Sequence, residues 1–485
     1  MTTRKLANKP VGHPRDEHLA RKQAVASQGD IPLSIESPGE AAGSMLPRMD
    51  GLNQRWRDLY HLFDPKKRLE SEDDDLFVER PSAVAERIIG DLDFEPSGKW
   101  VVCGSLGSGK SSELVRLGRK LWRNYTVIAL DLPSSSTRVD KLTPAELLFL
   151  IGAAAIRTAR DNAHPVPRSE ENRLIDAFQG LLEPGSRLNV GEILQGVALF
   201  IPNLVAPGIA SAVGAATGVA RVTGGLLGGT TRTFQEGEPA IQELTLAVNA
   251  VLQKVRDNLP PPVVLVDGLD KVQDLPTIRG LFTSTRLLSA PTAPIIYSGP
   301  ITLMISTVWN VAGSAFKRER LTNVVVQPPP PEWLSLDSAK IQAGRQAMRQ
   351  VVEKRLARYS LKSGDVFEEN TLESLITASG GVLRDLIHLV NRCCRFAYDA
   401  SKKNPEAKVD ARIADEAIME LRKEFEVTLT TKRLEELKHV KQTGEPSGNS
   451  DISSDLLLSN YVLPYSNGKV WFEPHPILRG VRPDL

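Results

Sequence analysis

Short hydrophobic runs alternate with longer amphipathic stretches between residues 76 and 327. The runs are brief and rich in Val, Ile and Leu, which is typical of strands buried on both faces of a parallel sheet. The stretches between them have helical spacing and predict βαβ connections. The sequence therefore predicts an α/β core whose strands lie at residues 100–103, 126–130, 263–266, 295–297 and 324–326.

The residues before this core follow a different pattern. Residues 1–48 are rich in Pro, Gly, Ser and charge and have no apolar face, so we expect them to be disordered. Residues 49–75 begin with apolar positions at helical spacing and end in an acidic run at residues 70–75. We expect this run to be a solvated loop rather than a metal site, because its carboxylates have no partner ligands at useful spacing.

The residues after the core predict two smaller parts. Four consecutive prolines at residues 328–331 predict a stiff hinge, because proline continues neither a strand nor a helix. Helical periodicity dominates residues 332–428 and predicts an α-helical lid. Residues 429–485 predict a small winged-helix-like module, with a polar linker at 441–455 and a hairpin at Asn467 and Gly468, whose type I′ turn needs positive φ at both positions.

Composition and charge narrow the classes of function. The chain has 485 residues, with 60 Lys and Arg against 59 Asp and Glu and a formal net charge of +1. This balance excludes the uniformly basic surface of a nucleic-acid coat and leaves a local patch open. Three cysteines exclude a disulfide framework and a four-cysteine zinc site. The first 30 residues contain no apolar signal-peptide segment, so we expect a cytoplasmic protein.

One motif, at residues 104–111, indicates a phosphate-binding loop. Its sequence, Gly-Ser-Leu-Gly-Ser-Gly-Lys-Ser, fits the P-loop pattern G-x-x-x-x-G-K-[ST] without a mismatch and lies between a predicted strand and a predicted helix. The glycines allow successive backbone N–H groups to point at a phosphate, and the helix adds the positive end of its dipole. We expect ATP to bind to Gly104, Ser105, Leu106, Gly107, Ser108, Gly109, Lys110, Ser111 and Ser112.

A P-loop needs a carboxylate from a neighbouring strand to hold Mg²⁺ and its water. Asp267 directly follows the apolar run at residues 263–266, so we expect Asp267 and the Ser111 hydroxyl to hold the metal. The next position, where many ATPases have a water-activating Glu, is Gly268. Asp270 is then the nearest candidate for the base that activates the water. The alternative is that Asp270 has no role. Hydrolysis would then be slow, and the protein would act as a nucleotide switch.

With these motifs, residues 76–425 resemble the AAA+ ATPases, within them the origin-recognition and STAND-like branch that includes NACHT-type switches. Residues 76–80, Leu-Phe-Val-Glu-Arg, look like the family's segment ahead of the P-loop, whose backbone contacts the adenine. Residues 267–270, Asp-Gly-Leu-Asp, are similar to the magnesium-binding motif of the NACHT-like members. Ser298 lies where the family has its sensor 1 residue, at the end of the strand beside that motif.

The resemblance also implies two roles for arginines. Arg318 and Arg320 lie just ahead of the predicted final strand, where these proteins have the arginine finger that reaches a neighbouring subunit's phosphate. The resemblance implies that one of them is this finger. The alternative is that they belong to the solvated basic end of a helix. Residues 379–386 look like the sensor 2 motif of the lid, which implies that Arg384 faces the nucleotide, the alternative being a surface residue.

A long insertion departs from the family pattern. Lys110 and Asp267 are 157 residues apart, and the excess includes a Gly- and Ala-rich stretch at residues 191–232. Residues 193–231 contain one charged residue and are long enough to cross a bilayer, although prolines interrupt them. We expect a buried or self-associating insertion. Membrane insertion, as in the KAP-type P-loop proteins, is the alternative.

These observations predict a parallel-sheet P-loop core with an α-helical lid and a winged-helix-like C-terminal module. The expected function is an ATP-binding, ATP-hydrolysing switch or motor that forms homo-oligomers on nucleotide binding, in bacterial signalling or defence by analogy with the STAND proteins. One alternative is DNA binding of origin-recognition type through the predicted basic lid helix, whose cations are Arg345, Arg349, Lys354, Arg355 and Arg358. Another is a nucleotide-gated effector at a membrane.

Overall fold

The computed structural model describes ten segments of the chain, which are residues 49–67, 71–80, 83–132, 141–182, 238–272, 274–283, 286–305, 308–328, 338–448 and 451–480. The N-terminal segment 1–48, the stretch 191–232 and most of the predicted proline hinge therefore lie outside the described residues. No helix in the described segments is both long and apolar enough to cross a bilayer.

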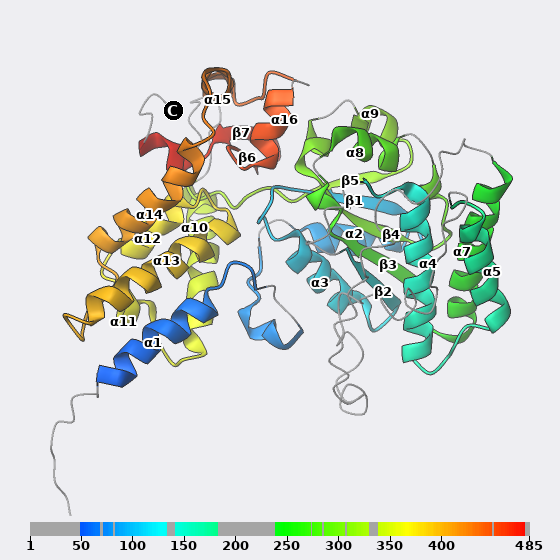
Figure 1. Cartoon of the computed structure of the whole chain (residues 1–485), viewed down its shortest axis with the longest axis horizontal. Helices are drawn as coiled ribbons and strands as arrows, with labels where there is room; N and C mark the ends of the chain where they lie inside the picture. Colours follow the sequence, from blue (N-terminus) through cyan, green and yellow to red (C-terminus); the bar gives the residue numbers. More distant parts are fainter. Residues whose placement is uncertain are drawn as a thin grey trace, which may run out of the picture. The chain divides into compact units, whose positions relative to one another are not determined.

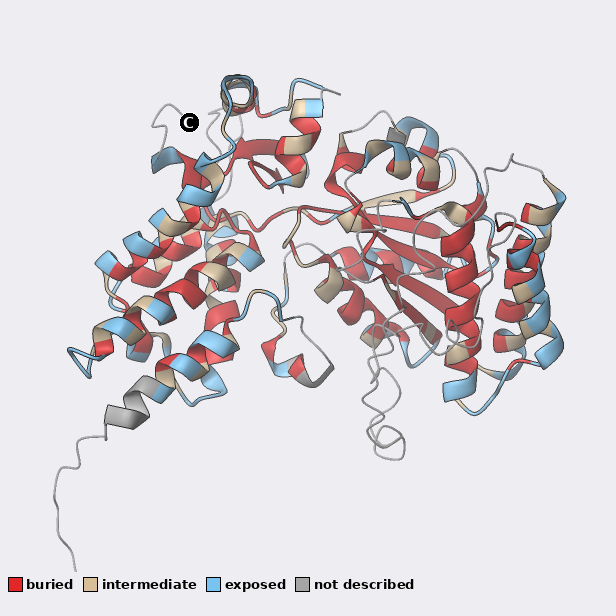
Figure 2. Ribbon diagram, viewed as in Figure 1, coloured by how far each residue is buried: buried red, intermediate tan, exposed pale blue. Residues whose placement is uncertain are grey.

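The centre of the core is a five-stranded parallel sheet in the order β2-β3-β4-β1-β5 (Figure 1). Its strands are β1 (Lys99–Cys103), β2 (Thr126–Asp131), β3 (Pro262–Asp267), β4 (Ile295–Gly299) and β5 (Lys317–Arg320). Every residue of β1, β3 and β4 is buried, as the continuous apolar runs predicted (Figure 2). The predicted α/β fold with a parallel sheet is confirmed.

Helices cover both faces of this sheet, and alternate residues of β1 show the division. Trp100 and Val102 pack with α2 (Val84–Leu92) and α3 (Lys110–Leu121) on one face. Val101 and Cys103 belong to the larger hydrophobic cluster on the other face. The helices between β2 and β3, where the long insertion begins and ends, are α4 (Pro144–Asp161), α5 (Arg168–Gln179) and α7 (Pro239–Asn258). Shorter elements follow β3 and β4, namely η3 (Leu269–Lys271), α8 (Leu275–Phe282), η4 (Leu287–Ser289), η5 (Ile301–Met304) and α9 (Val308–Ala312).

The described residues of the lid form α-helices and their connections, with one isolated β-bridge between Phe367 and Val409. It consists of α10 (Ser338–Ala357), α11 (Ser363–Val366), α12 (Thr371–Ala378), α13 (Leu383–Ser401) and α14 (Ala411–Glu426). The first helix of the described chain, α1 (Met49–Leu62), packs against α13 through its buried face, although more than 300 residues separate the two in sequence (Figure 1). A 3₁₀ helix, η1 (Ser71–Leu76), then connects this region with α2.

The C-terminal module is the predicted small winged-helix-like unit. It contains α15 (Thr431–Thr443), α16 (Asp451–Leu458), β6 (Val462–Ser466), β7 (Val470–Pro474) and η6 (Pro476–Gly480). The β6–β7 hairpin is confirmed, but its loop has three residues and only Gly468 has positive φ, at 86°, so the predicted type I′ turn is wrong. The expected linker begins later than predicted, because α15 continues to Thr443.

The fifth strand is not where the hydrophobic pattern placed it. Val324 and Val326 are buried and Val325 is partly buried, but they form no strand, while the charged residues 317–320 form β5 at the edge of the sheet. An edge strand needs no apolar run on both faces, and charged side chains protect its open edge from pairing with another chain. The prediction that residues 317–320 precede the last strand is therefore wrong, because they are that strand.

The acidic run and the basic lid helix pair with each other. Arg358 of α10 binds Asp73 and Asp75, at 2.8 Å in the case of Asp73, and Lys354 donates to the carbonyl of Phe77. Asp73 is 5% exposed, so the expectation of a wholly solvated loop is wrong for this residue. The pairing ties η1, and the segment that leads towards the P-loop, to the lid.

Candidate nucleotide site

The P-loop joins the end of β1 to the start of α3, as its motif predicted. Gly107 and Gly109 have φ angles of 79° and 92°, which side chains rarely adopt. A Cβ on Gly107 would also lie 2.6 Å from the Cβ of Arg384, so this glycine lets the lid approach the loop. Ser111 and Ser112 lie in the first turn of α3, where free backbone N–H groups and the helix dipole favour an anion.

Lys110 is buried beneath the loop and makes three polar contacts. Its Nζ donates to the carbonyls of Gly104 at 2.8 Å and Ser105 at 2.7 Å, and pairs with Asp270 Oδ2 at 2.9 Å. An ammonium has three N–H donors, so these contacts use all of them. A phosphate that binds Lys110 therefore competes with these three acceptors, of which the Asp270 carboxylate is the charged one.

The outer side of the loop is held by four separate parts of the chain. Asn460 Nδ2 donates to the Leu106 carbonyl at 2.8 Å, and the backbone N–H of Arg384 lies 3.4 Å from the Gly107 carbonyl. The remaining two contacts are Asn323 Nδ2 with Ser105 Oγ at 3.3 Å and the Arg80 guanidinium with the Ser108 carbonyl.

These contacts engage four consecutive residues of the loop, 105–108, through oxygen atoms and leave their N–H groups aside. In the described segments, the N–H groups of Leu106, Gly107 and Gly109 donate to no backbone carbonyl. Successive unpaired N–H groups in a turn form a concave anion site. The loop thus has the geometry that its motif requires.

Unsatisfied polar atoms also gather around the loop. Five buried side-chain atoms near it have no hydrogen-bond partner among the described residues, namely Arg80 Nη1, Ser108 Oγ, Asp270 Oδ1, Asn323 Oδ1 and Asn460 Oδ1. Each such atom costs about 1–3 kcal/mol, and more than nine in ten buried polar groups in folded proteins are paired. Their concentration at one place is what a site for a polar ligand produces.

The two acidic residues of the predicted magnesium motif occupy different positions. Asp267 ends β3 and is fully buried. Asp270 lies in η3; burial raises its pKa, but the charge and hydrogen bond of Lys110 outweigh this effect and hold the pKa below its usual value. Asp270 is therefore a carboxylate when it pairs with Lys110.

A carboxylate and a hydroxyl are oxygen ligands of the kind that Mg²⁺ prefers, and Mg²⁺ is usually held by one or two protein oxygens together with phosphates and water. Asp267 and Ser111 fit this donor set. No group of three or more His, Cys, Asp or Glu side chains in the described part of the chain forms a complete metal cage.

Arg80 is a site residue that no sequence motif predicted. Its guanidinium contacts the loop at Ser108, and a Cβ on Gly109 would lie 2.7 Å from Arg80 Nη2. Burial lowers the pKa of Arg80 to about 10, partly offset by Glu113. Arg80 belongs to the Leu-Phe-Val-Glu-Arg segment, whose resemblance implies a backbone contact with the adenine. A single sequence gives no sign that the Arg80 side chain also reaches the loop.

The two predicted sensor residues occupy different surroundings. Ser298 is fully buried on β4, and its hydroxyl accepts a hydrogen bond from the Gly268 N–H at 2.9 Å, so it braces the turn after Asp267. Arg384 begins α13 beside the P-loop with an exposed side chain whose charge acts on Asp270. Gly381, with φ of 72°, passes so close to the Val324 carbonyl that a Cβ would lie 1.8 Å from it.

The two candidate finger arginines differ in how far they are engaged. Arg318 donates to the carbonyls of Leu303 and Met304 at 3.0 and 3.2 Å and lies over the Trp309 ring. Arg320 is exposed at the end of β5 and has no hydrogen-bond or ion-pair partner in the described segments. Of the two, Arg320 is the one whose guanidinium has no polar contact in the described segments.

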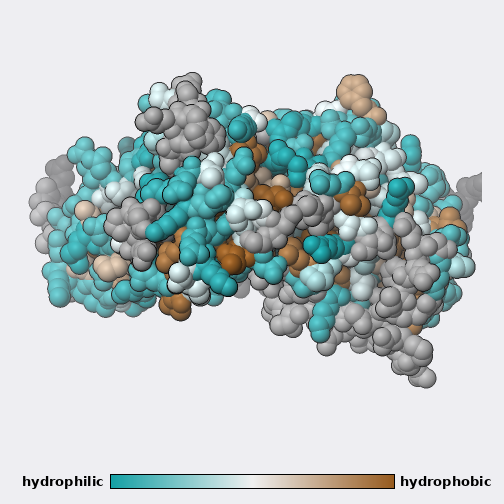
Figure 3. All heavy atoms as spheres, turned by 90° about the horizontal axis from the view of Figure 1, so that it is seen from above, coloured by the Kyte–Doolittle hydropathy of each residue, from teal (hydrophilic) through white to brown (hydrophobic). Residues whose placement is uncertain are grey.

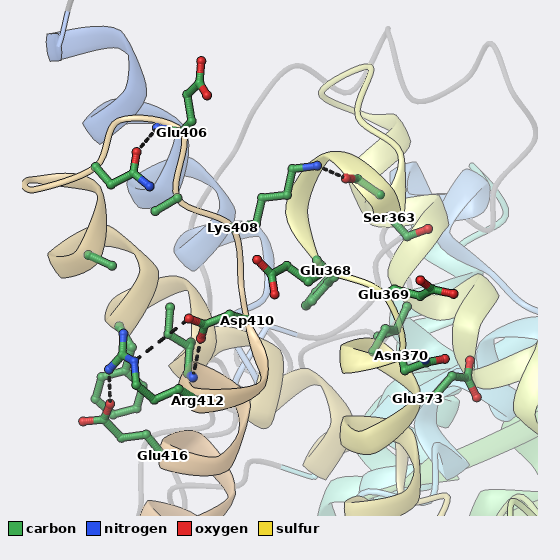
Figure 4. A pocket seen from close by; sticks show the side chains of 18 of the residues that line it. Ser363, Glu368, Glu369, Asn370, Glu373, Glu406, Lys408, Asp410, Arg412 and Glu416 are labelled. Atoms are coloured by element: carbon green, nitrogen blue, oxygen red, sulfur yellow. Dashed lines mark hydrogen bonds and ion pairs between the residues drawn. The ribbon is translucent and has the colours of Figure 1, made fainter.

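A cavity of about 1290 Å³ lies in the lid, apart from the P-loop residues (Figure 4). Several of its charged groups bind one another or the backbone: Arg412 is near Asp410 and Glu416, and Lys408 donates to the Gly364 carbonyl. It holds none of the predicted site residues. On the face seen in Figure 3, hydrophilic residues prevail and apolar ones form small separate groups.

Comparison with known proteins gives similar structures only. No protein-family profile and no curated protein sequence matches the chain. The chain is similar to a structure of the origin recognition complex of Drosophila bound to DNA, at 12% identity over 92% of this chain and 96% of that chain, with a TM-score of 0.36.

Two archaeal structures are also similar. The Orc1 protein of Aeropyrum pernix in complex with DNA is 12% identical, with 88% of this chain and 96% of that chain covered and a TM-score of 0.35. Cdc6p from Pyrobaculum aerophilum is 11% identical, with 87% of this chain and 96% of that chain covered and a TM-score of 0.30. The P-loop α/β fold with a helical lid and a winged-helix-like module follows from the elements described above.

Proposed function

We propose that this chain is an AAA+ type ATPase that binds ATP with Mg²⁺ and hydrolyses it. The main support is the loop itself: Lys110 is buried against it, three of its N–H groups donate to no backbone carbonyl in the described segments, and unsatisfied polar atoms lie near it. These features serve an anion with several phosphate oxygens and have no other evident use in the fold.

In this proposal, each residue has a role in phosphoryl transfer to water. Lys110 would neutralise the β- and γ-phosphates, and Asp270, once released from Lys110, would accept a proton from the attacking water. Ser111 and Asp267 would hold Mg²⁺, which would supply charge stabilisation for the transferred phosphate. Arg384 is close enough for its charge to act on this site from the lid.

The finer part of the proposal is a switch that reports its nucleotide to the rest of the chain. Core, lid and C-terminal module each contact this loop, the core at Ser105, the lid at Gly107 and the module at Leu106, so a change of nucleotide acts on each of them. Homo-oligomerisation through Arg320, and a role in bacterial signalling or defence, rest on the resemblance to AAA+ and STAND proteins and on the free guanidinium.

DNA binding through the basic lid helix has less support. Arg345 and Arg349 both bind Glu373, and Arg358 binds Asp73 and Asp75. Arg355 is buried, and Lys354 binds a carbonyl. Cations that are already paired gain little from phosphate contacts, so α10 is not the open basic surface that the sequence predicted. A membrane role through residues 193–231 lies outside the described residues.

The test is turnover and assembly of three proteins: the full chain, Lys110→Ala and Lys120→Ala. Lys120 lies at the other end of α3 and pairs with Glu86 on the surface, so it controls for loss of a lysine from the same helix. We expect phosphate release from ATP and nucleotide-dependent light scattering for the full chain and Lys120→Ala, with both lost in Lys110→Ala. Equal turnover in all three would contradict the proposal.

A further inference from the structure

Two aspartates end neighbouring strands of the sheet side by side. Asp131 is the last residue of β2 and Asp267 is the last residue of β3, and the register of these parallel strands pairs the two residues directly. Neighbouring strands lie about 4.8 Å apart, so two residues paired in this way have adjacent side chains on the same face of the sheet. The proposed magnesium site uses only Asp267 of this pair.

Both aspartate side chains point to the face of the sheet that α3 covers. Successive residues of a strand alternate between the two faces. Leu130 and Val266, which directly precede the two aspartates, belong to the hydrophobic cluster on the opposite face. Ala129, two residues before Asp131, packs instead against Val115 of α3. The two carboxylates therefore lie on the α3 side of the sheet.

The first turn of α3 lies level with these carboxylates. Helix α3 returns from the end of β1 to the start of β2, so it runs antiparallel to the strands that it covers. Ser111 lies one turn before Val115 on the same face of the helix, about 6 Å nearer the edge at which the strands end. Asp131 lies two residues beyond Ala129, about 6.6 Å nearer the same edge. The contact between Val115 and Ala129 therefore places Ser111 at the level of Asp131.

The side chains at this edge are the oxygen ligands that Mg²⁺ prefers. The ion is usually held by one or two carboxylates together with phosphates and several waters. Ser111 and Asp267 fit this set, and Asp131 adds a second carboxylate. Asp270 follows at the same edge; its Oδ2 pairs with Lys110, while its Oδ1 is buried without a partner among the described residues. Water bound to a cation could donate to this oxygen and remove the cost of leaving it unpaired.

The alternative for Asp131 is a structural role at the end of β2. Lys271 of η3 donates to the carbonyl of Leu132, the next residue, at 3.3 Å, so an ammonium comes near the end of this strand. In that role, the Asp131 carboxylate would stabilise the turn after Asp267 whether or not a metal is bound. The two roles therefore differ in their dependence on Mg²⁺.

We propose that Asp131 is the second carboxylate of the magnesium site and holds the Mg²⁺ of the bound nucleotide together with Asp267 and Ser111. The inference rests on the proposed function, which assigns the metal to Asp267 and Ser111 alone. Two adjacent carboxylates attract a divalent cation and repel a bare polyphosphate. The site therefore favours the magnesium complex of the nucleotide over the metal-free nucleotide, and Asp131 contributes to this preference.

The experiment measures the dissociation constant of a non-hydrolysable ATP analogue by calorimetry on the full chain, once with Mg²⁺ and once with EDTA. Asp131→Asn keeps the size of the side chain and removes its charge, and Asp131→Ser takes its place if the first variant does not melt cooperatively. Asp267→Asn is the reference for loss of a metal ligand. Asp257→Asn, at an exposed position near the end of α7, is the control for loss of one surface charge.

A charged contact with the metal or its water corresponds to about 10- to 100-fold in affinity. We expect Asp131→Asn and Asp267→Asn each to bind the analogue at least about 10-fold more weakly with Mg²⁺. With EDTA both variants should bind it as tightly as the unmodified chain or more tightly, because a negative charge near the phosphates has been removed. Asp257→Asn should change neither value.

A titration with Mg²⁺ at a fixed concentration of the analogue gives a second measurement. The Mg²⁺ concentration at half-maximal binding should rise by a similar factor in Asp131→Asn, and this result decides the question if binding with EDTA is too weak to measure. A loss of equal size with Mg²⁺ and with EDTA, or an unchanged Mg²⁺ dependence, overturns the inference. If the unmodified chain binds the analogue under neither condition, the proposed function itself has failed.

Discussion

Replacing Asp270 with asparagine separates its two expected roles. In the structure its carboxylate accepts the third N–H of the Lys110 ammonium at 2.9 Å, and the side chains of Asp270 and Lys110 are 10% and 2% exposed. At an effective dielectric constant of about 20, the attraction at this distance is about 6 kcal/mol, and desolvation of the two ions cancels much of it. A charged hydrogen bond then contributes a net amount of about 1.5–3 kcal/mol.

Asp270→Asn removes this competitor, so we expect ADP and ATP to bind about 10- to 100-fold more tightly. The unliganded variant should also melt at a lower temperature, because Lys110 loses its buried counter-ion. Turnover should fall at the same time if Asp270 accepts the proton of the attacking water.

Calorimetry measures the affinity, a melting curve without nucleotide measures stability, and phosphate release measures turnover. Asp257→Asn, an exposed carboxylate at the end of α7, is the control for removing one negative charge. Unchanged or weaker nucleotide binding by the Asp270→Asn variant would refute the claim that this carboxylate holds the place of a phosphate. Normal turnover would refute its role as the base.

Three further predictions concern residues around the site. Burial lowers the pKa of Lys99 to about 8, so below that pH the folded state holds a buried cation that lowers its stability. Lys99→Met should therefore raise the free energy of unfolding by up to about 3 kcal/mol at pH 7. Melting curves should show this gain shrinking as the pH rises from about 8 towards 10.5. Arg358→Met should loosen the segment before the P-loop and weaken ATP binding several-fold. If Arg358 and Asp73 act as one pair, Asp73→Asn should cause little further loss of ATP affinity in the double mutant. Arg320→Ala should slow turnover only at concentrations where the chain self-associates, whereas Arg318→Ala should lower the melting temperature, because Arg318 binds carbonyls of its own subunit.

The parts of the fold that the sequence predicted are those with a local signal. The P-loop is a contiguous motif, and four strands appear as short apolar runs because both faces of the sheet are covered. The fifth strand gives no such signal, because it lies at the edge of the sheet and carries Lys, Arg and Glu. Residues 324–326 gave a false signal, because Val324 is buried through contacts such as that with Gly381 in the lid and not within the sheet.

The rest of the site depends on contacts between distant parts of the chain. Arg358 and Asp73 are 285 positions apart, and Asn460 and Leu106 are 354 apart, so neither spacing nor periodicity indicates either pair. DNA binding through the basic helix is an alternative at the level of sequence for this reason, since charge counts do not show which cations are already paired. Arg80 lay within a recognised segment, but only the fold shows its side chain against the loop.

The most direct test of the account is a calorimetric titration of the full chain with ATP and with ADP in the presence of Mg²⁺. The account predicts saturable binding of both nucleotides at one site per chain, lost in Lys110→Ala, a variant that should still melt cooperatively. A folded chain that gives no binding heat with either nucleotide would contradict it.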